Sequence, residues 1–166
     1  MPQEIERKFL VKGKPWEQQS NVNSRQIQQG YISKSKKHTV RIRIVSSKTS
    51  PAEKTSTVNT LAFITIKGPK CGFTCDEFEY RIPIEEAFQL INLCDGDLIE
   101  KTRHTFRDEN DQRWEVDVFK GINDGLVVAE IELVSEATPV VLPSWISMEV
   151  TFDKRYSNSY LSAHKI

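Results

Sequence analysis

Charged side chains at every second position mark several segments of this chain. In the opening run Glu4–Val11, alternation along a strand places Glu4, Glu6 and Lys8 on one face and mostly apolar residues on the other. The same alternation recurs, with a pair of bases or a pair of acids in each segment, at 40–44, 99–103, 114–118 and 130–133. One such strand would be an ordinary half-buried strand. On successive strands, the acid pairs and base pairs predict a site for a polyanion and a metal ion.

The basic members of this pattern suit a chain of phosphates. Enclosing several cations without counter-charge is costly, because each desolvated ion loses several kcal/mol of hydration. A bound polyphosphate would supply the counter-charge, and arginine forks match phosphate oxygens. For any single pair, the alternative is pairing with a carboxylate or exposure to solvent on an open sheet. The predicted phosphate-binding residues are Lys8, Arg41, Arg43, Lys67, Lys101 and Arg103.

The acidic members suit a divalent cation. Carboxylate oxygens are the ligands that Mg²⁺ or Mn²⁺ prefers, and Mg²⁺ often shares its coordination shell with substrate phosphates. Clustered carboxylates also repel one another, and a bound cation relieves that repulsion. Solvated strand faces would explain one acidic pair but not three. The predicted metal ligands are Glu4, Glu6, Asp117, Glu130 and Glu132, with Glu79 and Glu115 as weaker members.

Lys8 and Tyr31 are a candidate pair for activating water. Neighbouring Arg and Lys side chains would lower the pKa of Lys8, and a lysine tuned in this way can act as a general base. The Tyr31 hydroxyl would then contact the Lys8 side chain. The alternative for Tyr31 is an ordinary core position, which is the more common role of a tyrosine in a strand.

Composition and missing motifs exclude other function classes. The 23 basic and 23 acidic residues cancel, so no global field would attract nucleic acid or a membrane surface. No apolar run approaches the ~20 residues of a spanning helix. The chain has no Gly-x-Ser-x-Gly elbow, P-loop or Gly-x-Gly-x-x-Gly motif, which argues against acyl transfer, Walker-type hydrolysis and dinucleotide binding.

The cysteines indicate a reducing compartment. Cys71, Cys75 and Cys94 are odd in number and show no disulfide framework, and the three histidines are scattered singly. A structural zinc site normally takes four ligands, so we expect reduced thiols instead. The protein is therefore predicted to be cytoplasmic.

Periodicity and turn signals predict one mainly β (α+β) domain over 1–166. Strands are expected at 4–11, 25–33, 39–45, 62–67, 77–82, 98–106, 113–119 and 127–134. A helix is expected at 83–94, a short helix or turn at 15–19, a short strand or helix end at 147–152 and a terminal helix at 157–164. The polar stretch Ser46–Thr60 is predicted to be a long mobile hairpin loop. These elements favour a closed or nearly closed antiparallel barrel with a charged lumen.

The ordered set of motifs resembles the CYTH superfamily, the triphosphate tunnel metalloenzymes, and its short bacterial branch in particular. Glu4–Val11 is similar to the N-terminal ExExK signature of that family. The likeness continues almost end to end, through Gln29–Ile32, Thr39–Arg43, Ala62–Pro69, Glu77–Tyr80, Ile99–Arg103, Trp114–Phe119, Gly125–Leu133, Glu149–Thr151 and Arg155–Asn158. The Ser46–Thr60 loop looks longer than is usual in the family.

The resemblance implies an eight-stranded antiparallel tunnel that hydrolyses inorganic tripolyphosphate to pyrophosphate and phosphate with Mg²⁺ or Mn²⁺. It assigns metal to the acidic set and phosphate to the basic set, and it assigns activation of water to Lys8 and Tyr31. Lys154 and Arg155 are weaker site candidates. The resemblance, and apolar faces that few helices can cover, predict a homodimer. A class IV adenylate cyclase, a thiamine or nucleoside triphosphatase and a non-catalytic polyphosphate-binding module remain alternatives.

Overall fold

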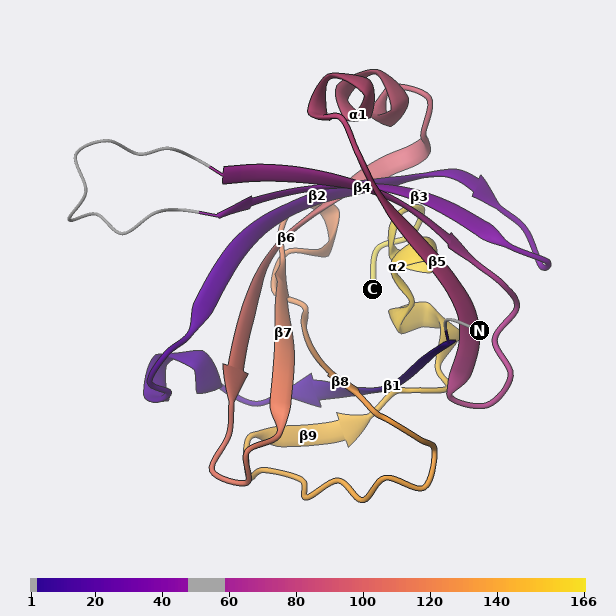
Figure 1. The fold of residues 1–166 in the computed structure, drawn as a ribbon. Coiled ribbons are helices and arrows are strands. Elements are labelled where there is room, and N and C mark those ends of the chain that lie inside the picture. The colour runs from indigo at the N-terminus through magenta and orange to yellow at the C-terminus, as the bar shows by residue number, and fades with distance from the viewer. Residues whose placement is uncertain (1–2, 48–58) are drawn as a thin grey trace, which may run out of the picture.

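The computed structural model describes residues 3–47 and 59–166, which form a single curved sheet with short helices (Figure 1). The strands are β1 (Gln3–Val11), β2 (Asn23–Lys34), β3 (Thr39–Ser47), β4 (Asn59–Lys67), β5 (Thr74–Ile82), β6 (Asp95–Arg107), β7 (Arg113–Phe119), β8 (Val127–Glu132) and β9 (Ile146–Glu149). The α-helices are α1 (Ile84–Ile91) and α2 (Asn158–Leu161), and 3₁₀ turns lie at Pro15–Gln18, Gly121–Asn123 and Lys154–Tyr156.

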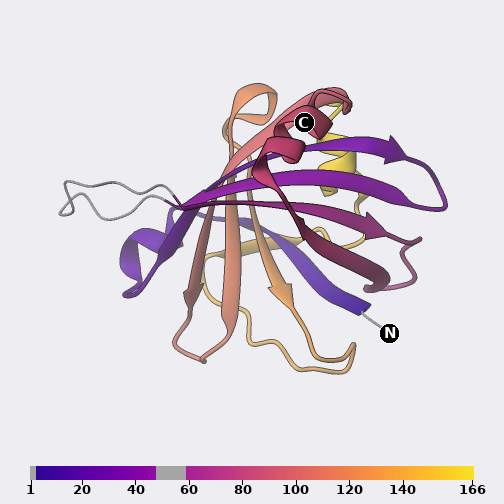
Figure 2. The same ribbon diagram turned by 45° about the horizontal axis from the view of Figure 1, so that its top comes forward.

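Eight antiparallel strands close into a barrel, as predicted. Their order is β5-β4-β3-β2-β6-β7-β8-β1, and β1 closes the barrel by pairing with β5 through Gln3–Ile5. Beyond this contact β1 pairs with β8 through Glu6–Leu10, and β9 adds an extra strand beside the end of β1. Figure 2 shows the strands curving around a central space. Closure removes the exposed edges that an open sheet would carry.

The alternation of side chains sorts the barrel wall into an inner and an outer face. On the outer face, α1 covers β3 and β4 and buries Ile42, Ile44 and Ala62. A second outer cluster centres on Phe9 and Trp114, and Trp145 and Ile146 from the segment before and within β9 pack against it. The predicted shortage of covering helices is therefore met in part by a returning strand.

One end of the barrel interior is apolar. Tyr31, Ile99, Phe119 and Val128 come from four different strands and pack with Leu161 of α2. In Figure 1 the C-terminal segment, coloured yellow, lies across this part of the barrel. The charged part of the lumen therefore ends in an apolar cluster.

Several predicted boundaries were wrong, because local signals do not report packing. The helix expected at 83–94 is shorter, Ile84–Ile91, and β6 already begins at Asp95. The terminal helix at 157–164 shrinks to the single turn α2. Gly30 lies within β2, where the register of β2 against β6 shifts between Gln29 and Tyr31. A Cβ on Gly30 would lie 2.7 Å from Leu98 Cδ2, so this glycine permits a close approach.

The remaining fold predictions have mixed outcomes. Most of the predicted loop Ser46–Thr60 lies outside the described residues, although Ser46–Ser47 and Asn59–Thr60 extend β3 and β4. All three cysteines are free thiols. Within residues 3–47 and 59–166, no helix has the length and apolar character needed to cross a membrane.

Candidate active site

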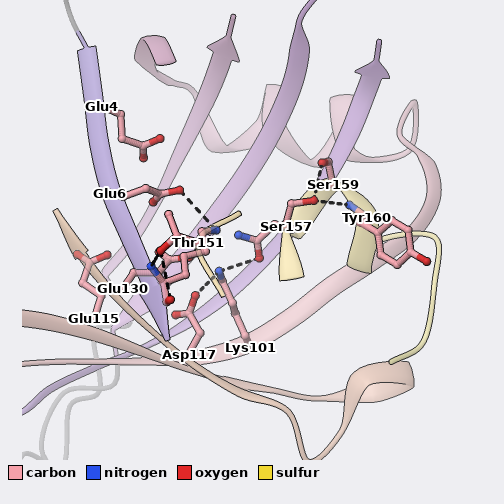
Figure 3. Close-up of polar contacts among 12 residues, drawn as sticks. Glu4, Glu6, Lys101, Glu115, Asp117, Glu130, Thr151, Ser157, Ser159 and Tyr160 are labelled. Carbon is pink, nitrogen blue, oxygen red and sulfur yellow. Dashed lines mark hydrogen bonds and ion pairs between the residues drawn. The ribbon is translucent and has the colours of Figure 1, made fainter. Parts of the chain in front are cut away.

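The charged part of the lumen is a cavity of about 390 Å³ that contains both acids and bases. Among its lining residues are Glu4, Glu6, Lys8, Arg41, Arg43, Lys67, Glu79, Arg103, Glu115, Glu130 and Glu132. It adjoins a larger cavity of about 810 Å³, since Glu4, Glu6, Lys8, Arg41, Lys67 and Asn158 line both. In Figure 3, Glu4 and Glu6 approach from one side, and Ser157 to Tyr160 of the C-terminal segment lie on the other.

The register of β1 against β8 explains the charges around Lys8. Glu6 lies opposite Glu132, and Lys8 lies opposite Glu130. The Lys8 Nζ atom is 3.1 Å from Glu130 and 3.5 Å from Glu6. Burial lowers the pKa of Lys8, but the Glu130 and Glu6 carboxylates outweigh burial and raise it above its ordinary value. The expected lowering of the Lys8 pKa was therefore wrong, because its nearest charges are acids.

Tyr31 is buried among apolar residues. It packs with Ile99, Phe119, Val128 and Leu161 and also lines the larger cavity. No hydrogen bond joins Tyr31 to Lys8 in the part of the chain that the structure describes. The geometry corresponds to the core alternative for Tyr31.

A second group of charges joins β1, β3, β4 and β5. Lys67 contacts Glu4 directly and lies 3.5 Å from Glu77. Burial raises the pKa of Glu4, but Lys67 outweighs it and lowers that pKa to about 2. Burial and the charge of Glu4 raise the pKa of Glu77 to about 7, despite the opposing effect of Lys67. The combined negative charge of Glu4 and Glu77 is thus only partly compensated by Lys67.

Arg41 belongs to the same group. One of its terminal nitrogens lies 2.9 Å from Thr65 Oγ1 and 3.2 Å from Glu79 Oε2. The Thr65 hydroxyl donates to the same Glu79 oxygen at 2.8 Å. Glu79 therefore fixes the guanidinium of Arg41 against the wall formed by β4 and β5.

Lys101, Arg103 and Asp117 form the deepest charged group. Asp117 is fully buried and accepts from Lys101 Nζ at 2.5 Å and from Arg103 Nε at 2.7 Å. Arg103 also contacts Glu115 and lies 2.9 Å from Glu130. Burial raises the pKa of Asp117, but Arg103 and Lys101 outweigh it and lower that pKa. Neither Lys101 nor Asp117 lines the cavity; both lie behind Arg103.

The acidic residues have the chemistry of a divalent cation site, although they contact bases in this structure. Among residues 3–47 and 59–166, no three side chains of His, Cys, Asp or Glu converge as a ready coordination set. Glu132 lines the cavity, and its pKa is raised by partial burial and by the nearby charges of Glu4, Glu115 and Glu6. This excess of negative charge, carried on oxygen donors, suits a hard divalent cation.

The C-terminal segment contributes one residue that the sequence did not reveal. Asn158 lines the lumen, and its side-chain oxygen accepts from Lys101 Nζ at 3.2 Å. Lys154 lines the larger cavity, whereas Arg155 is exposed and pairs with Asp153 at 2.6 Å. Glu77 was also missed, although it shares the alternation of Glu79 and that signal could have identified it.

The comparisons with known proteins identify the family of this closed barrel with acids and bases in its lumen. The family model described as the CYTH domain matches residues 2–161. An inorganic triphosphatase of Acetivibrio thermocellus is 40% identical over 162 residues, covering 97% of this chain and 94% of that protein. An inorganic triphosphatase of Nitrosomonas europaea is 31% identical, with 96% of each chain covered. The chain belongs to the CYTH domain family.

Solved structures support the same fold. A crystal structure of an inorganic triphosphatase superposes with a TM-score of 0.66 at 30% identity, covering 99% of this chain and 97% of that one. A protein from Pyrococcus horikoshii superposes with a TM-score of 0.58 at 21% identity, covering 81% of this chain and 80% of that one. The second likeness shows the fold alone.

Proposed function

We propose that this protein hydrolyses inorganic tripolyphosphate to pyrophosphate and phosphate with the help of a divalent metal ion. The observation that carries the proposal is the enclosed cavity of about 390 Å³, lined by both cations and carboxylates. Two family members with near-complete coverage are named inorganic triphosphatases, which supports the same substrate. A tripolyphosphate is small, highly charged and without an organic part, so a polar lumen can hold it.

The basic residues that line the cavity would bind the phosphates. The lining includes Lys8, Arg41, Arg43, Lys67 and Arg103, which come from four strands of the barrel, β1, β3, β4 and β6. Surrounding a phosphate chain with fixed cations stabilises the charge that develops during phosphoryl transfer and holds the terminal phosphate for attack by water. Lys101 does not line the cavity and would act indirectly, through its contacts with Asp117 and Asn158.

Carboxylates on β1 and β8, with help from β7, would hold the metal ion. Glu4, Glu6, Glu130 and Glu132 are the proposed ligands, with Glu115 and Asp117 in support. When bound, Mg²⁺ or Mn²⁺ would neutralise phosphate charge and orient the substrate. Lys8 is proposed mainly as a protonated phosphate ligand, since its neighbouring carboxylates raise its pKa. A role of Lys8 and Tyr31 in activating water has less support from the geometry.

The larger adjoining cavity favours a second candidate. Its volume of about 810 Å³ and its aromatic residues Phe152 and Tyr160 would accommodate the organic part of ATP or thiamine triphosphate. A nucleoside or thiamine triphosphatase, or an adenylate cyclase, would use the same lumen for its phosphates. A binding module without turnover is the alternative of another class.

The test is phosphate release from tripolyphosphate, ATP and thiamine triphosphate, each with Mg²⁺ and then with Mn²⁺. We expect tripolyphosphate to be the preferred substrate and metal chelation to abolish the activity. Preference for an organic triphosphate would support the second candidate, and cyclic AMP formation from ATP would indicate a cyclase. Binding of tripolyphosphate without phosphate release in either metal would favour the binding module.

Variants connect the activity to the lumen. Glu130→Gln removes a carboxylate that contacts Lys8 and Arg103, and we expect it to lower turnover by about 10-fold or more, because charge stabilisation dominates such sites. Glu109→Gln changes an exposed glutamate of the β6–β7 turn and is the matched control. A Glu130→Gln variant as active as Glu109→Gln would contradict the site assignment.

We propose three further properties with the function. The chain acts as one domain over 1–166, since strands from both ends share one sheet. A cytoplasmic location fits its three free thiols. A homodimer would cover exposed apolar residues such as Phe78 and Tyr80 on the outer face of β5. Gel filtration coupled to light scattering tests the last of these.

A further inference from the structure

Arg43 differs from the other cations of the lumen. Lys8, Arg41, Lys67 and Arg103 each form an ion pair with at least one carboxylate. Arg43 forms none among residues 3–47 and 59–166, although it lines the same cavity. Arg43 is therefore the cation whose charge the described part of the protein leaves uncompensated.

Gln29 is the residue that holds Arg43. Gln29 lies on β2 directly opposite Arg43 on β3, and its side chain is fully buried. The Nε atom of Arg43 donates to the Gln29 side-chain oxygen at 2.9 Å. This is the one side-chain hydrogen bond of Arg43 within the described residues, so both terminal nitrogens stay available to a ligand in the lumen.

Packing alone does not explain a glutamine at this position. The amide nitrogen of Gln29 is buried and makes no hydrogen bond in the described structure. A buried donor without a partner destabilises the fold, and an apolar side chain of similar size would avoid that cost. The hydrogen bond to Arg43 is the one feature that an apolar side chain could not reproduce.

The neutrality of Gln29 also matters. A carboxylate at this position would pair with Arg43 and cancel its charge, as Asp117 does for part of the charge of Arg103. An amide orients the guanidinium without neutralising it. Burial, with Arg41 and Arg103 nearby, lowers the pKa of Arg43 to about 10, which still leaves it cationic at neutral pH.

These observations lead to one inference, which rests on the proposed function and adds a residue to it. We propose that Gln29 is a positioning residue that orients Arg43, so that the free guanidinium nitrogens of Arg43 receive a phosphate group of tripolyphosphate. Gln29 acts through Arg43 and does not itself line the cavity. Its contribution is to binding of the phosphate chain.

The test compares Gln29→Met with Gln28→Met. Methionine keeps the volume of Gln29 but cannot accept a hydrogen bond of comparable strength. Gln28 points to the opposite face of β2, where its amide lies 3.4 Å from Glu100, and it serves as the control. Tripolyphosphate binding is measured by calorimetry in EDTA, which prevents turnover. We expect Gln29→Met to weaken binding by about 10-fold, the usual effect of losing a hydrogen bond to a charged group, and Gln28→Met to leave it unchanged.

Two further readouts separate positioning from a structural role. The midpoint of thermal unfolding of Gln29→Met should stay close to that of the wild type, because the variant removes one donor without a partner, the Gln29 amide nitrogen, and leaves another, Arg43 Nε. In an Arg43→Ala background, Gln29→Met should have no additional effect on binding, since its effect passes through Arg43.

The outcomes distinguish this inference from the proposed function. Wild-type protein that binds neither tripolyphosphate in EDTA nor its nonhydrolysable imido analogue with Mg²⁺ would overturn the proposed function and, with it, this inference. Wild-type binding together with unchanged binding in Gln29→Met would overturn the inference alone. The same holds if the loss in Gln29→Met persists undiminished in the Arg43→Ala background.

Discussion

Replacing Asp117 with asparagine should destabilise the protein strongly. The Asp117 carboxylate is fully buried and accepts from Lys101 at 2.5 Å and from Arg103 at 2.7 and 2.8 Å. In Asp117→Asn, Arg103 still has two glutamate partners, whereas Lys101 has no other carboxylate partner among residues 3–47 and 59–166. Lys101 would keep neutral acceptors alone, the amide oxygen of the new asparagine and the side-chain oxygen of Asn158 at 3.2 Å. Removing one partner of a buried ion pair typically costs about 3–5 kcal/mol, because the other charge is left uncompensated.

Urea unfolding at pH 7 in EDTA measures this effect without bound metal. We expect Asp117→Asn to lose about 3 kcal/mol or more of unfolding free energy. In thermal unfolding, this loss corresponds to a fall in the midpoint temperature of about 6–12 °C. Lys101→Met should lower the unfolding free energy by less than Asp117→Asn does, because Asp117 keeps both contacts with Arg103. Asp111→Asn, in an exposed turn, is the control and should change stability by less than about 0.5 kcal/mol. If Asp117→Asn is as stable as this control, the reasoning is refuted.

Two other predictions concern the scaffold. Asp108 accepts from the Asn110 and Gln112 backbones and from Trp114 Nε1, and these hydrogen bonds outweigh burial and lower its pKa. Its stabilising effect is thus present above an unfolded pKa of about 3.9 and is lost as the pH falls through the lower folded value. Asp108→Asn should therefore lower the unfolding free energy by about 1–3 kcal/mol at pH 7. Urea unfolding should show this loss shrinking below pH ~3. A loss that is independent of pH would argue against the stabilising role of the Asp108 carboxylate. Gly30→Ala should cost about 1–3 kcal/mol by the same assay, because its Cβ would overlap the β6 side of the wall, and a variant of wild-type stability would show that this contact relaxes freely.

The lumen could be predicted from the sequence because alternation along a strand is a local property. Glu4, Glu6 and Lys8 share a face wherever β1 lies, and the same is true of Arg41 and Arg43 on β3. Closure followed from the number of strands and from the physical cost of exposed edges. These two arguments required no knowledge of which strands are neighbours.

Properties that depend on neighbours across the sheet could not be predicted. The pKa of Lys8 rises because the register places Glu130 opposite it, and no local pattern reports that register. Asn158 reaches the lumen from a single turn that has no periodicity. Gln29 sits in a strand where its partner could be identified only from the pairing of β2 with β3. Strand pairing, not composition, decides how each charge is used.

The lumen carries two opposite excesses of charge side by side, and this predicts coupling between its ligands. Glu132 has its pKa raised by burial and by neighbouring acids, whereas Arg43 has its pKa lowered by burial and by neighbouring bases. A cation relieves the first excess and a phosphate chain relieves the second, so each should favour binding of the other. A nonhydrolysable imido analogue of tripolyphosphate and Mg²⁺ together should raise the unfolding midpoint by more than the sum of their separate effects. Additive shifts would mean that the two excesses are independent, and that the acids and bases of this barrel do not serve one bound complex.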